Sequence, residues 1–280
     1  MQQNSRSPLA FVALTLLVAS LLLVWNGMSR YQDYLGHQEQ LNFRVTHAVA
    51  NELAVQIREL QQRVSLFSTE ESELIARVAR EPDDQALAAR LKRLVQRHFP
   101  NHFAFGVTSA RGEPLIVDLD NLVGEVCLQD LARFSAGDHP YAVHIHPQPG
   151  AYHFDIMARW PGGRDTRGAF FVSFPPTMVS RVLRHGELDD HRLLLLNADQ
   201  RGLIEVTSRG ARDTLDGPLR LSPEQLGRTR HLVPVPGTRW VVAHLPAPGL
   251  HRDVLGSIAR ETGLFIVTLV LVSAFMVRFM

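Results

Sequence analysis

Residues 41–67 read LNFRVTHAVANELAVQIRELQQRVSLF, and this stretch decides the fold. Its apolar side chains recur every three or four residues, the spacing that places side chains in one stripe along a helix. Neither Pro nor Gly interrupts the run, so the sequence predicts a continuous helix of about 55 Å between residues 29 and 67. The alternative is a core helix of a soluble domain, although such helices average about 11–12 residues. The stripe consists of Leu41, Val45, Val49, Leu53, Ile57, Leu60, Val64 and Phe67.

The composition describes an ordered globular protein that is long enough for one large or two modest domains. Its 280 residues are 45% apolar and 20% charged. Because 29 basic residues nearly balance 28 acidic ones, no charge excess indicates a nucleic-acid partner. Cys127 is the single cysteine, which excludes an intrachain disulfide and a zinc cage built from cysteines.

Two apolar segments flank the polar middle of the chain. Residues 8–25 contain FVALTLLVASLLLVW, which is just long enough to cross the hydrocarbon core of a bilayer. A cleaved signal peptide is the alternative, but the residues that follow lack a small-x-small cleavage site. A second apolar run, GLFIVTLVLVSAFMV, lies within a linker helix and span that we expect at 249–280. With two spans both termini share one side, which Arg6 and Arg278 indicate is the cytoplasm, so residues 29–255 are expected outside.

The periodicity changes from helical to alternating near residue 100. A helical stalk and spine is expected at 29–100, where Pro82-Asp83-Asp84 begins a second helix that ends near His98. A membrane-distal module follows at 101–176, with the predicted order strand, strand, helix and three strands. These segments are 103–108, 114–119, 126–134, 141–146, 151–159 and 169–174.

A smaller version of this pattern fills residues 177–248. A connector helix at 177–184 is followed by two strands, one helical turn and a last hairpin. These segments are 192–197, 203–207, 223–226, 231–235 and 238–245. The expected fold class is therefore α+β, with a long N-terminal helix packed on two antiparallel-sheet modules and flanked by two transmembrane helices.

This plan resembles the extracytoplasmic double-Cache (PAS-like) sensor region of bacterial transmembrane receptors. FAFGVTSARGEPLIVD at 103–118 and LLLLNADQRGLIEVTS at 193–208 match the strand, glycine turn and strand that open such modules, and RGAFFVSF at 167–174 fits the last strand of the distal module. The resemblance implies a periplasmic ligand sensor anchored in the bacterial inner membrane. Receptors of this family usually continue into a diguanylate cyclase, histidine kinase or chemoreceptor-type output domain, so this chain is expected to be either the sensory part of a longer protein or a receptor that signals through a partner. Amino-acid specificity is not implied, because Pro161 follows Arg159-Trp160 where amino-acid-binding members carry Tyr.

The best candidate site lies on two predicted strands of the distal module. Alternation places His144 and His146 on one face of the first strand, and His153 and Asp155 on one face of the second. A hairpin turn at 147–150 would bring the two polar rows to the same face of the sheet. Three imidazoles and a carboxylate suit Zn, Ni or Cu, so these four residues are the candidate ligands of a divalent metal. A solvated sheet face is the alternative.

The same polar row can instead line a site for a small molecule, while the apolar row packs on the long helix. His144, His153 and Asp155 would then face the ligand. Arg159 would clamp a carboxylate or phosphate, unless it is an ordinary surface residue. The expected margin of the site consists of His139 and Arg159, and its expected rim consists of Tyr141 and Trp160.

Signals for catalysis are weak. The sequence lacks H-E-x-x-H, G-x-S-x-G, a P-loop and a dinucleotide fingerprint after a strand. Asp118 and Asp120 fit a turn at the end of a strand, and Cys127 fits a small core residue. We therefore expect a ligand sensor without enzymatic activity of its own. The alternative is a membrane-tethered, metal-dependent enzyme that uses the His/Asp cluster.

A homodimer is the expected assembly. The stripe is longer than one small module can cover, and its part at residues 41–49 would pair with a second copy, because large exposed apolar patches are uncommon on monomers. The alternative is that the proximal module covers this part.

Overall fold

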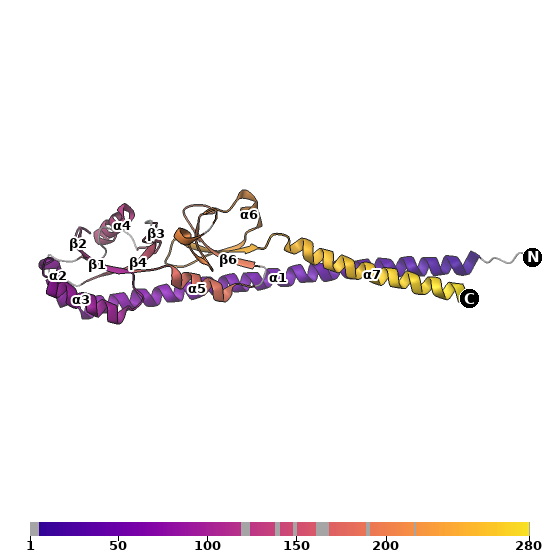
Figure 1. Ribbon diagram of the computed structural model, residues 1–280, viewed down its shortest axis with the longest axis horizontal. Helices are drawn as coiled ribbons and strands as arrows, with labels where there is room; N and C mark the ends of the chain where they lie inside the picture. The colour runs from indigo at the N-terminus through magenta and orange to yellow at the C-terminus, as the bar shows by residue number, and fades with distance from the viewer. Residues whose placement is uncertain are drawn as a thin grey trace, which may run out of the picture. The chain divides into compact units, whose positions relative to one another are not determined.

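The computed structural model describes residues 6–118, 124–137, 141–147, 150–160, 168–188, 191–215 and 217–279. The chain forms two compact units. One unit is Val45–Leu245, and the other combines Met1–Arg44 with Pro246–Met280. Figure 1 labels the elements along the chain.

The first helix extends without interruption to Glu70 and has 65 residues, as the stripe predicts. The second predicted helix also forms, because the Asp84 side chain accepts hydrogen bonds from the backbone N–H groups of Ala86 (2.9 Å) and Leu87 (3.2 Å) and so caps it. The helices are α1 (Arg6–Glu70), α2 (Ser72–Arg80), α3 (Gln85–His98), α4 (Glu125–Ala136), α5 (Thr177–Gly186), α6 (Pro223–Arg228) and α7 (Leu250–Phe279), with a 3-10 helix η1 (Arg212–Thr214).

Two five-stranded sheets follow, one in each module, so the fold class is α+β as predicted. The distal sheet has the order β2-β1-β5-β4-β3, and every pairing in it is antiparallel. Its strands are β1 (Ala104–Thr108), β2 (Pro114–Val117), β3 (Ile145–His146), β4 (His153–Arg159) and β5 (Ala169–Phe174). The proximal sheet has the order β8-β7-β6-β10-β9. Its strands are β6 (His191–Asn197), β7 (Ile204–Thr207), β8 (Gly210–Ala211), β9 (Arg230–Pro234) and β10 (Trp240–Pro246).

The stripe on α1 forms one side of the main core. Its buried residues are at most 6% exposed and belong to the same apolar cluster as both sheets, and Leu60 packs against this cluster while partly exposed. Phe67 stacks on Phe170 of β5 with ring centroids 5.3 Å apart. Val49 packs against the end of α5, where a Cβ on Gly186 would overlap it. The buried stripe residues are Val49, Leu53, Ile57, Val64 and Phe67.

This packing leaves a different face of α1 available for a dimer contact. Val49, which was expected to pair with a second copy, is covered within its own chain by α5 of the proximal module. Between residues 45 and 70 of α1, the large apolar side chains that are exposed are instead Val55 and Leu66. They lie about three turns apart and therefore on one face of the helix.

The two faces of the distal sheet differ in chemistry. Ile145, Phe154 and Ile156 lie in the main core with the α1 stripe. On β4 the residues between them point to the other face, which α4 covers with Cys127 and Leu131. The apolar row therefore packs on the long helix, and the polar row faces α4.

The third predicted strand of the distal module is shorter than expected. The prediction spanned 141–146, but only Ile145–His146 pairs with β4. The reason is that the Val143 backbone pairs with the proximal module instead: its N–H donates to the Gly237 carbonyl (3.0 Å) and its carbonyl accepts from the Arg239 N–H (2.8 Å). Val143 thus links the two modules through backbone hydrogen bonds. The short elements α2, β8 and η1 were not predicted.

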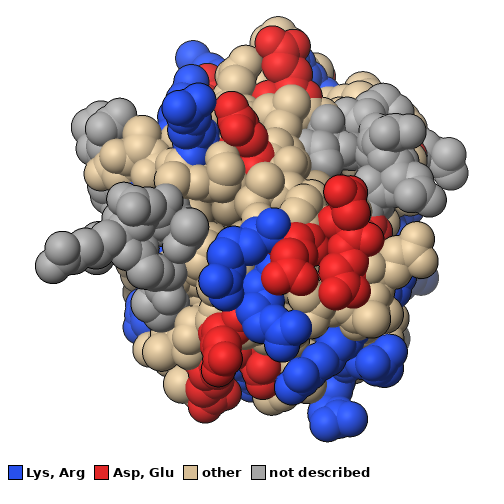
Figure 2. Space-filling model, turned by 90° about the vertical axis from the view of Figure 1, so that its left-hand side faces the viewer, with Lys and Arg blue, Asp and Glu red and all other residues tan. Residues whose placement is uncertain are grey.

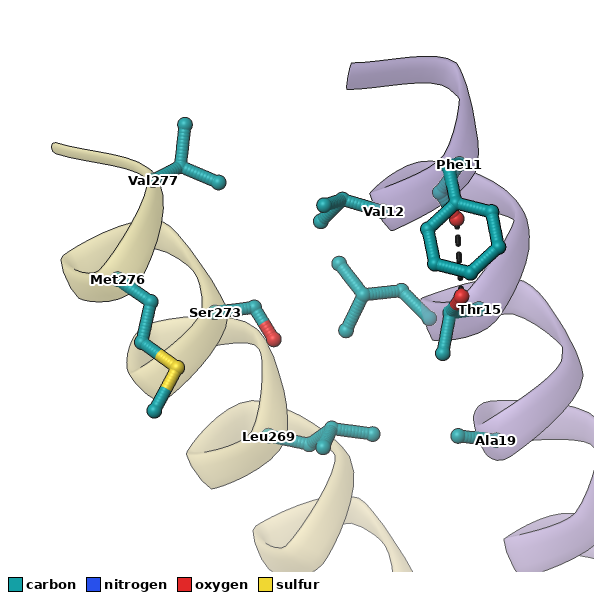
Figure 3. A pocket seen from close by; sticks show the side chains of 9 residues that line it. Phe11, Val12, Thr15, Ala19, Leu269, Ser273, Met276 and Val277 are labelled. Carbon is teal, nitrogen blue, oxygen red and sulfur yellow. Dashed lines mark hydrogen bonds between the residues drawn. The ribbon is translucent and has the colours of Figure 1, made fainter. Parts of the chain in front are cut away.

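The other unit contains both candidate membrane spans. Within α1 and α7 the most apolar windows have mean hydropathies of 2.1 and 1.8, and almost none of their residues are buried. The two helices touch where Gly27 faces Thr262, since an added Cβ would lie 2.8 Å from the Thr262 hydroxyl. Arg30 pairs with Glu261 at 3.2 Å. A pocket of about 220 Å³ lies between the two helices (Figure 3). It is lined mainly by apolar side chains, from Phe11, Val12, Thr15, Leu16, Ala19, Leu269, Ser273, Met276 and Val277.

The charged side chains are well mixed on the visible surface. Figure 2 shows the end that carries α2 and α3, where patches of Lys and Arg alternate with patches of Asp and Glu. This view gives no continuous basic face of the kind that phosphate backbones bind.

Candidate functional site

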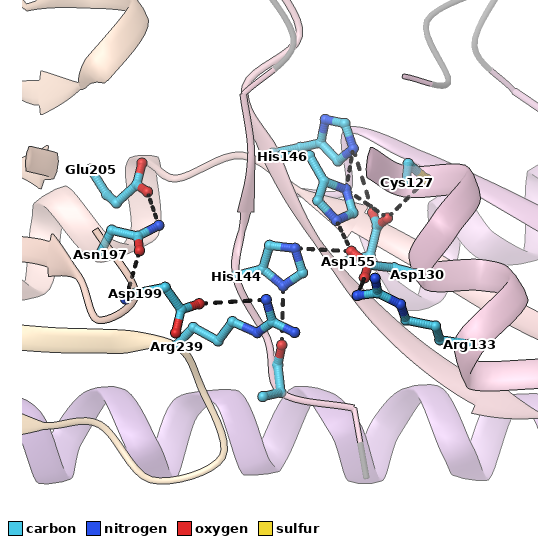
Figure 4. Close-up of polar contacts among 12 residues, drawn as sticks. Cys127, Asp130, Arg133, His144, His146, Asp155, Asn197, Asp199, Glu205 and Arg239 are labelled. Atoms are coloured by element: carbon cyan, nitrogen blue, oxygen red, sulfur yellow. Dashed lines mark hydrogen bonds and ion pairs between the residues drawn. The ribbon is translucent and has the colours of Figure 1, made fainter. Parts of the chain in front are cut away.

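A cluster of histidine and aspartate side chains lies between the distal sheet and α4 (Figure 4). We call it the histidine cluster: His144, His146, His153, Asp130 and Asp155, with Cys127 and Ser173 at its edge. Each of these side chains is buried, with residue exposures between 0% for Asp155 and 8% for His144. Ionisable side chains are rarely buried without partners, so the stability of the histidine cluster depends on the hydrogen bonds and ion pairs within it.

Local sequence explains how the cluster assembles. His146 stands directly opposite His153 in the β3–β4 ladder, and Asp155 stands opposite Ser173 in the β4–β5 ladder. Alternation puts these four side chains on one sheet face. On α4, the i, i+3 spacing of Cys127 and Asp130 presents both to that face.

Asp130 forms the first half of the cluster. Its Oδ2 atom lies 2.9 Å from His144 Nε2 and 3.1 Å from His146 Nε2. His144 is oriented from its other side, because its Nδ1 lies 3.1 Å from the Ala142 carbonyl oxygen. The two imidazoles therefore converge on a single carboxylate oxygen.

Asp155 forms the second half. Its Oδ2 lies 3.1 Å from His146 Nδ1 and accepts the Cys127 thiol at 3.4 Å, and its Oδ1 accepts the Ser173 hydroxyl at 2.5 Å. His153 Nε2 is 3.3 Å from His146 Nδ1 and 3.6 Å from Asp155 Oδ1, while His153 Nδ1 bonds to the Ala151 carbonyl oxygen. His146 is the shared residue, with one ring nitrogen in each half.

The electrostatics follow from this geometry. Burial alone would lower the pKa of His146, but hydrogen bonds to Asp130 and Asp155 outweigh it and raise that pKa to about 12. Burial alone would raise the pKa of Asp155, yet His146 holds it at about 2, and the pKa of Asp130 is also well below its usual value. Burial lowers the pKa of His153 and raises that of the Cys127 thiol to about 11. His146 is thus a cation between the carboxylates of Asp130 and Asp155. The imidazole of His153 and the thiol of Cys127 beside it are neutral.

The structure brings together His144, His146, His153 and Asp155, the four residues predicted to bind a metal. It places Trp160 and Arg159, which were predicted to contact a small-molecule ligand, outside this cluster. Trp160 is 1% exposed in the main apolar core, so it does not form a rim. The Arg159 guanidinium donates to the carbonyl oxygens of Phe134 (2.6 Å) and Ser135 (3.3 Å) near the end of α4, outside the cluster. His139 lies outside the described residues.

Tyr141 lies beside the cluster on the α4 side. Its ring centroid is 6.0 Å from that of His144 and 6.3 Å from that of Phe134. Its hydroxyl is buried and has no hydrogen-bond partner among the described residues. A buried donor without a partner is costly, so this hydroxyl is available to a bound molecule.

Sequence reasoning missed Asp130 and Ser173, and it treated Cys127 as core. The strand periodicity of β5 contains the signal for Ser173, which shares a face with the polar row of its neighbour β4. For Asp130 the signal is its i+3 spacing from Cys127 on a predicted helix, but that pattern is common on solvated helix faces.

No family model matches the chain, and no curated protein matches it in sequence. Among solved structures, the sensor domain of the histidine kinase DctB from V. cholerae superposes with a TM-score of 0.53 at 10% identity, over 78% of this chain and 98% of that one. The ligand-binding domain of the Pseudomonas aeruginosa PAO1 amino-acid chemoreceptor PctB, in complex with L-Arg, gives 0.50 at 11% identity, over 75% and 95% of the two chains. The chain therefore has the fold of the sensor domains of histidine kinases and chemoreceptors, which confirms the predicted resemblance.

Proposed function

We propose that this chain is the ligand-sensing part of a bacterial transmembrane signalling receptor, with no enzymatic activity of its own. The fold of known sensor domains and the two candidate spans support this function. The observation that carries it is the buried polar cluster on the sheet face opposite α1. A ligand there contacts a sheet whose other face packs on a helix that continues into an apolar segment.

The proposed ligand is small and contacts the α4 side of the distal sheet. The structure of the chemoreceptor domain of similar fold is a complex with L-Arg, and a small polar molecule or ion would suit this cluster too. We place it against His144, His153, Asp155 and the unpartnered Tyr141 hydroxyl. Arg159 already donates to two carbonyl oxygens, so it would take part only after releasing them.

A thermal-shift screen of the full chain in nanodiscs tests this function. Amino acids, organic acids and divalent metal ions are added singly, and hydrolase substrates are assayed in parallel. A sensor should be stabilised by at least one compound without turning over a substrate, because a ligand that binds only the folded state raises the melting temperature. Metal-dependent turnover without any ligand-induced shift would instead support the enzyme alternative.

We propose that residues 29–255 lie in the periplasm and that both ends of the chain lie in the cytoplasm. Alkaline phosphatase is active only after export. A fusion after residue 200 should therefore be active, and a fusion after residue 280 should be inactive. Equal expression of both fusions, checked by immunoblotting, is the control, and the reverse activity pattern would contradict this topology.

We also propose a homodimer that uses the outward face of α1. Val55 and Leu66 are 44% and 59% exposed, whereas Leu53 is fully buried in its own chain. With Cys127 replaced by Ser, a cysteine at Leu66 should cross-link between chains in membranes and a cysteine at Leu53 should not. Equal cross-linking at both positions, or none at Leu66 and Val55, would contradict the dimer.

A further inference from the structure

The half of the histidine cluster around Asp130 has the donor set of a transition-metal site. His144 Nε2 and His146 Nε2 both face Asp130 Oδ2, and the ligand atoms of this triad all lie within 4.8 Å of one another. Donor atoms about 2.0 Å from a tetrahedral zinc ion lie about 3.3 Å apart. The observed separations of 2.9 and 3.1 Å are within a few tenths of an ångström of that value, so small side-chain shifts would admit the ion.

The surroundings of the two imidazoles match those of metal ligands. A ligating histidine usually donates its second ring N–H to a carboxylate or a backbone carbonyl, which leaves the other nitrogen free for the metal. His146 Nδ1 faces the Asp155 carboxylate at 3.1 Å, and His144 Nδ1 faces the Ala142 carbonyl at 3.1 Å. Both hydrogen-bond acceptors orient Nε2 toward the same point, where the metal ion would replace the proton that His146 Nε2 holds in the metal-free protein.

A second triad of Cys127, His146 and Asp155 also gathers within 4.8 Å. It is the weaker candidate, because Asp155 already accepts the Ser173 hydroxyl on one oxygen and the Cys127 thiol on the other. In this arrangement Asp155 orients His146 and does not need to bind the metal itself.

We propose that Asp130, His144 and His146 bind one divalent late transition-metal ion, with Asp155 as the residue that positions His146. Two nitrogens and one oxygen favour zinc, copper or nickel over magnesium and calcium, which prefer oxygen ligands. Three protein ligands leave the fourth tetrahedral position open to water or to a small ligand.

The metal would lie next to the backbone hydrogen bonds that link the two modules at Val143. Val143, which bonds through its backbone to Gly237 and Arg239 of the proximal module, immediately precedes His144. An ion that fixes His144 therefore favours one placement of the strand that joins the two modules. This signalling consequence rests on the proposed sensor function, whereas metal binding itself does not.

The test uses the full chain in nanodiscs, purified with a removable tag that contains no histidine and then stripped with a chelator. Zinc is titrated against a chromophoric chelator, and X-ray absorption of the zinc-loaded protein identifies the ligand atoms. We expect one ion per chain, two imidazole nitrogens and no sulfur in its shell. Because this measurement uses the unmodified protein, it does not depend on whether any variant folds.

Variants assign the site. His144→Ala should weaken zinc binding by more than about 100-fold, and Asp155→Asn by about 10–100-fold, the usual effect of losing an outer-shell partner. His185→Ala removes an exposed histidine of α5 and is the matched control, with affinity unchanged. Far-UV circular dichroism verifies the fold of each variant.

Several results would overturn the proposal. Sulfur in the zinc shell, or a thiolate charge-transfer band in the cobalt-loaded protein, would assign the metal to the Cys127 triad. Absence of binding at micromolar zinc, or equal affinity in His144→Ala and His185→Ala, would leave the cluster as a structural network. If an organic compound still stabilises the chain in the thermal-shift screen, the sensor function stands while the metal site fails. If neither a metal ion nor an organic compound stabilises the chain, the proposed sensor function and the proposed metal site are both contradicted.

Discussion

Replacing Asp155 by Ala should lower the free energy of unfolding of the metal-free protein by about 3–5 kcal/mol, because one partner of a buried ion pair is removed. Asp155 is fully buried and accepts hydrogen bonds from the Ser173 hydroxyl and the Cys127 thiol, besides facing His146. Without it, the charge on His146 would be balanced by Asp130 alone. Urea unfolding of the full chain in detergent, followed by far-UV circular dichroism, measures the loss.

Asp118→Ala is the matched control for Asp155→Ala. Asp118 pairs with Lys92 at 2.7 Å, but the lysine side chain is 46% exposed, so this pair should contribute only about 0–1 kcal/mol. If both variants lost the same small amount, the histidine cluster would not be the buried charge network described here.

The second large effect is expected at the centre of the α1 stripe. Leu53 is fully buried in the apolar cluster that includes both sheets. Leu53→Ala should therefore cost about 2–5 kcal/mol, through lost burial and the cavity that remains. The same urea unfolding experiment measures it.

Leu66→Ala is the same substitution on the same helix, at a side chain that is 59% exposed. It should change stability in the monomeric, detergent-solubilised protein by no more than about 0.5 kcal/mol. A comparable loss in both variants would mean that the buried face of α1 has been assigned wrongly.

Periodicity alone predicted most of the fold. The three- and four-residue steps on α1 describe a helix with one buried face, and the alternation on β4 separates a row that packs on α1 from a row that faces α4, so these patterns determine the type of element. The Asp84 cap and the glycine turn at Gly112, whose φ is 82°, fixed local boundaries. For these elements local preference and tertiary packing agree.

Long-range pairing could not be predicted in the same way. The strand expected at 141–146 is short because Val143 pairs with the proximal module, a contact between segments almost a hundred residues apart. The sequence predicts Trp160 at the rim of the site, but Trp160 lies in the packed core, because its position depends on how the sheet packs on α1.

In the candidate site, too, the local alternation could be predicted from the sequence and the long-range packing could not. Alternation predicted that His144, His146, His153 and Asp155 share one face, and the β3–β4 register agrees for His146 and His153, whereas His144 precedes β3. Asp130 comes from a helix whose docking on the sheet is a tertiary property. Its role became visible only from its distances to the two imidazoles.

We propose that binding of a ligand on the α4 side of the distal sheet changes the conformation of the two candidate membrane-spanning helices. Hydrogen exchange of the full chain in nanodiscs, with and without zinc or the strongest compound from the thermal-shift screen, tests it most directly. We expect ligand binding to protect α4, β3 and β4 from exchange and to change the exchange rate in α1 before Val45 or in α7. Protection confined to other elements, or protection of the cluster with no change in either helix, would contradict it.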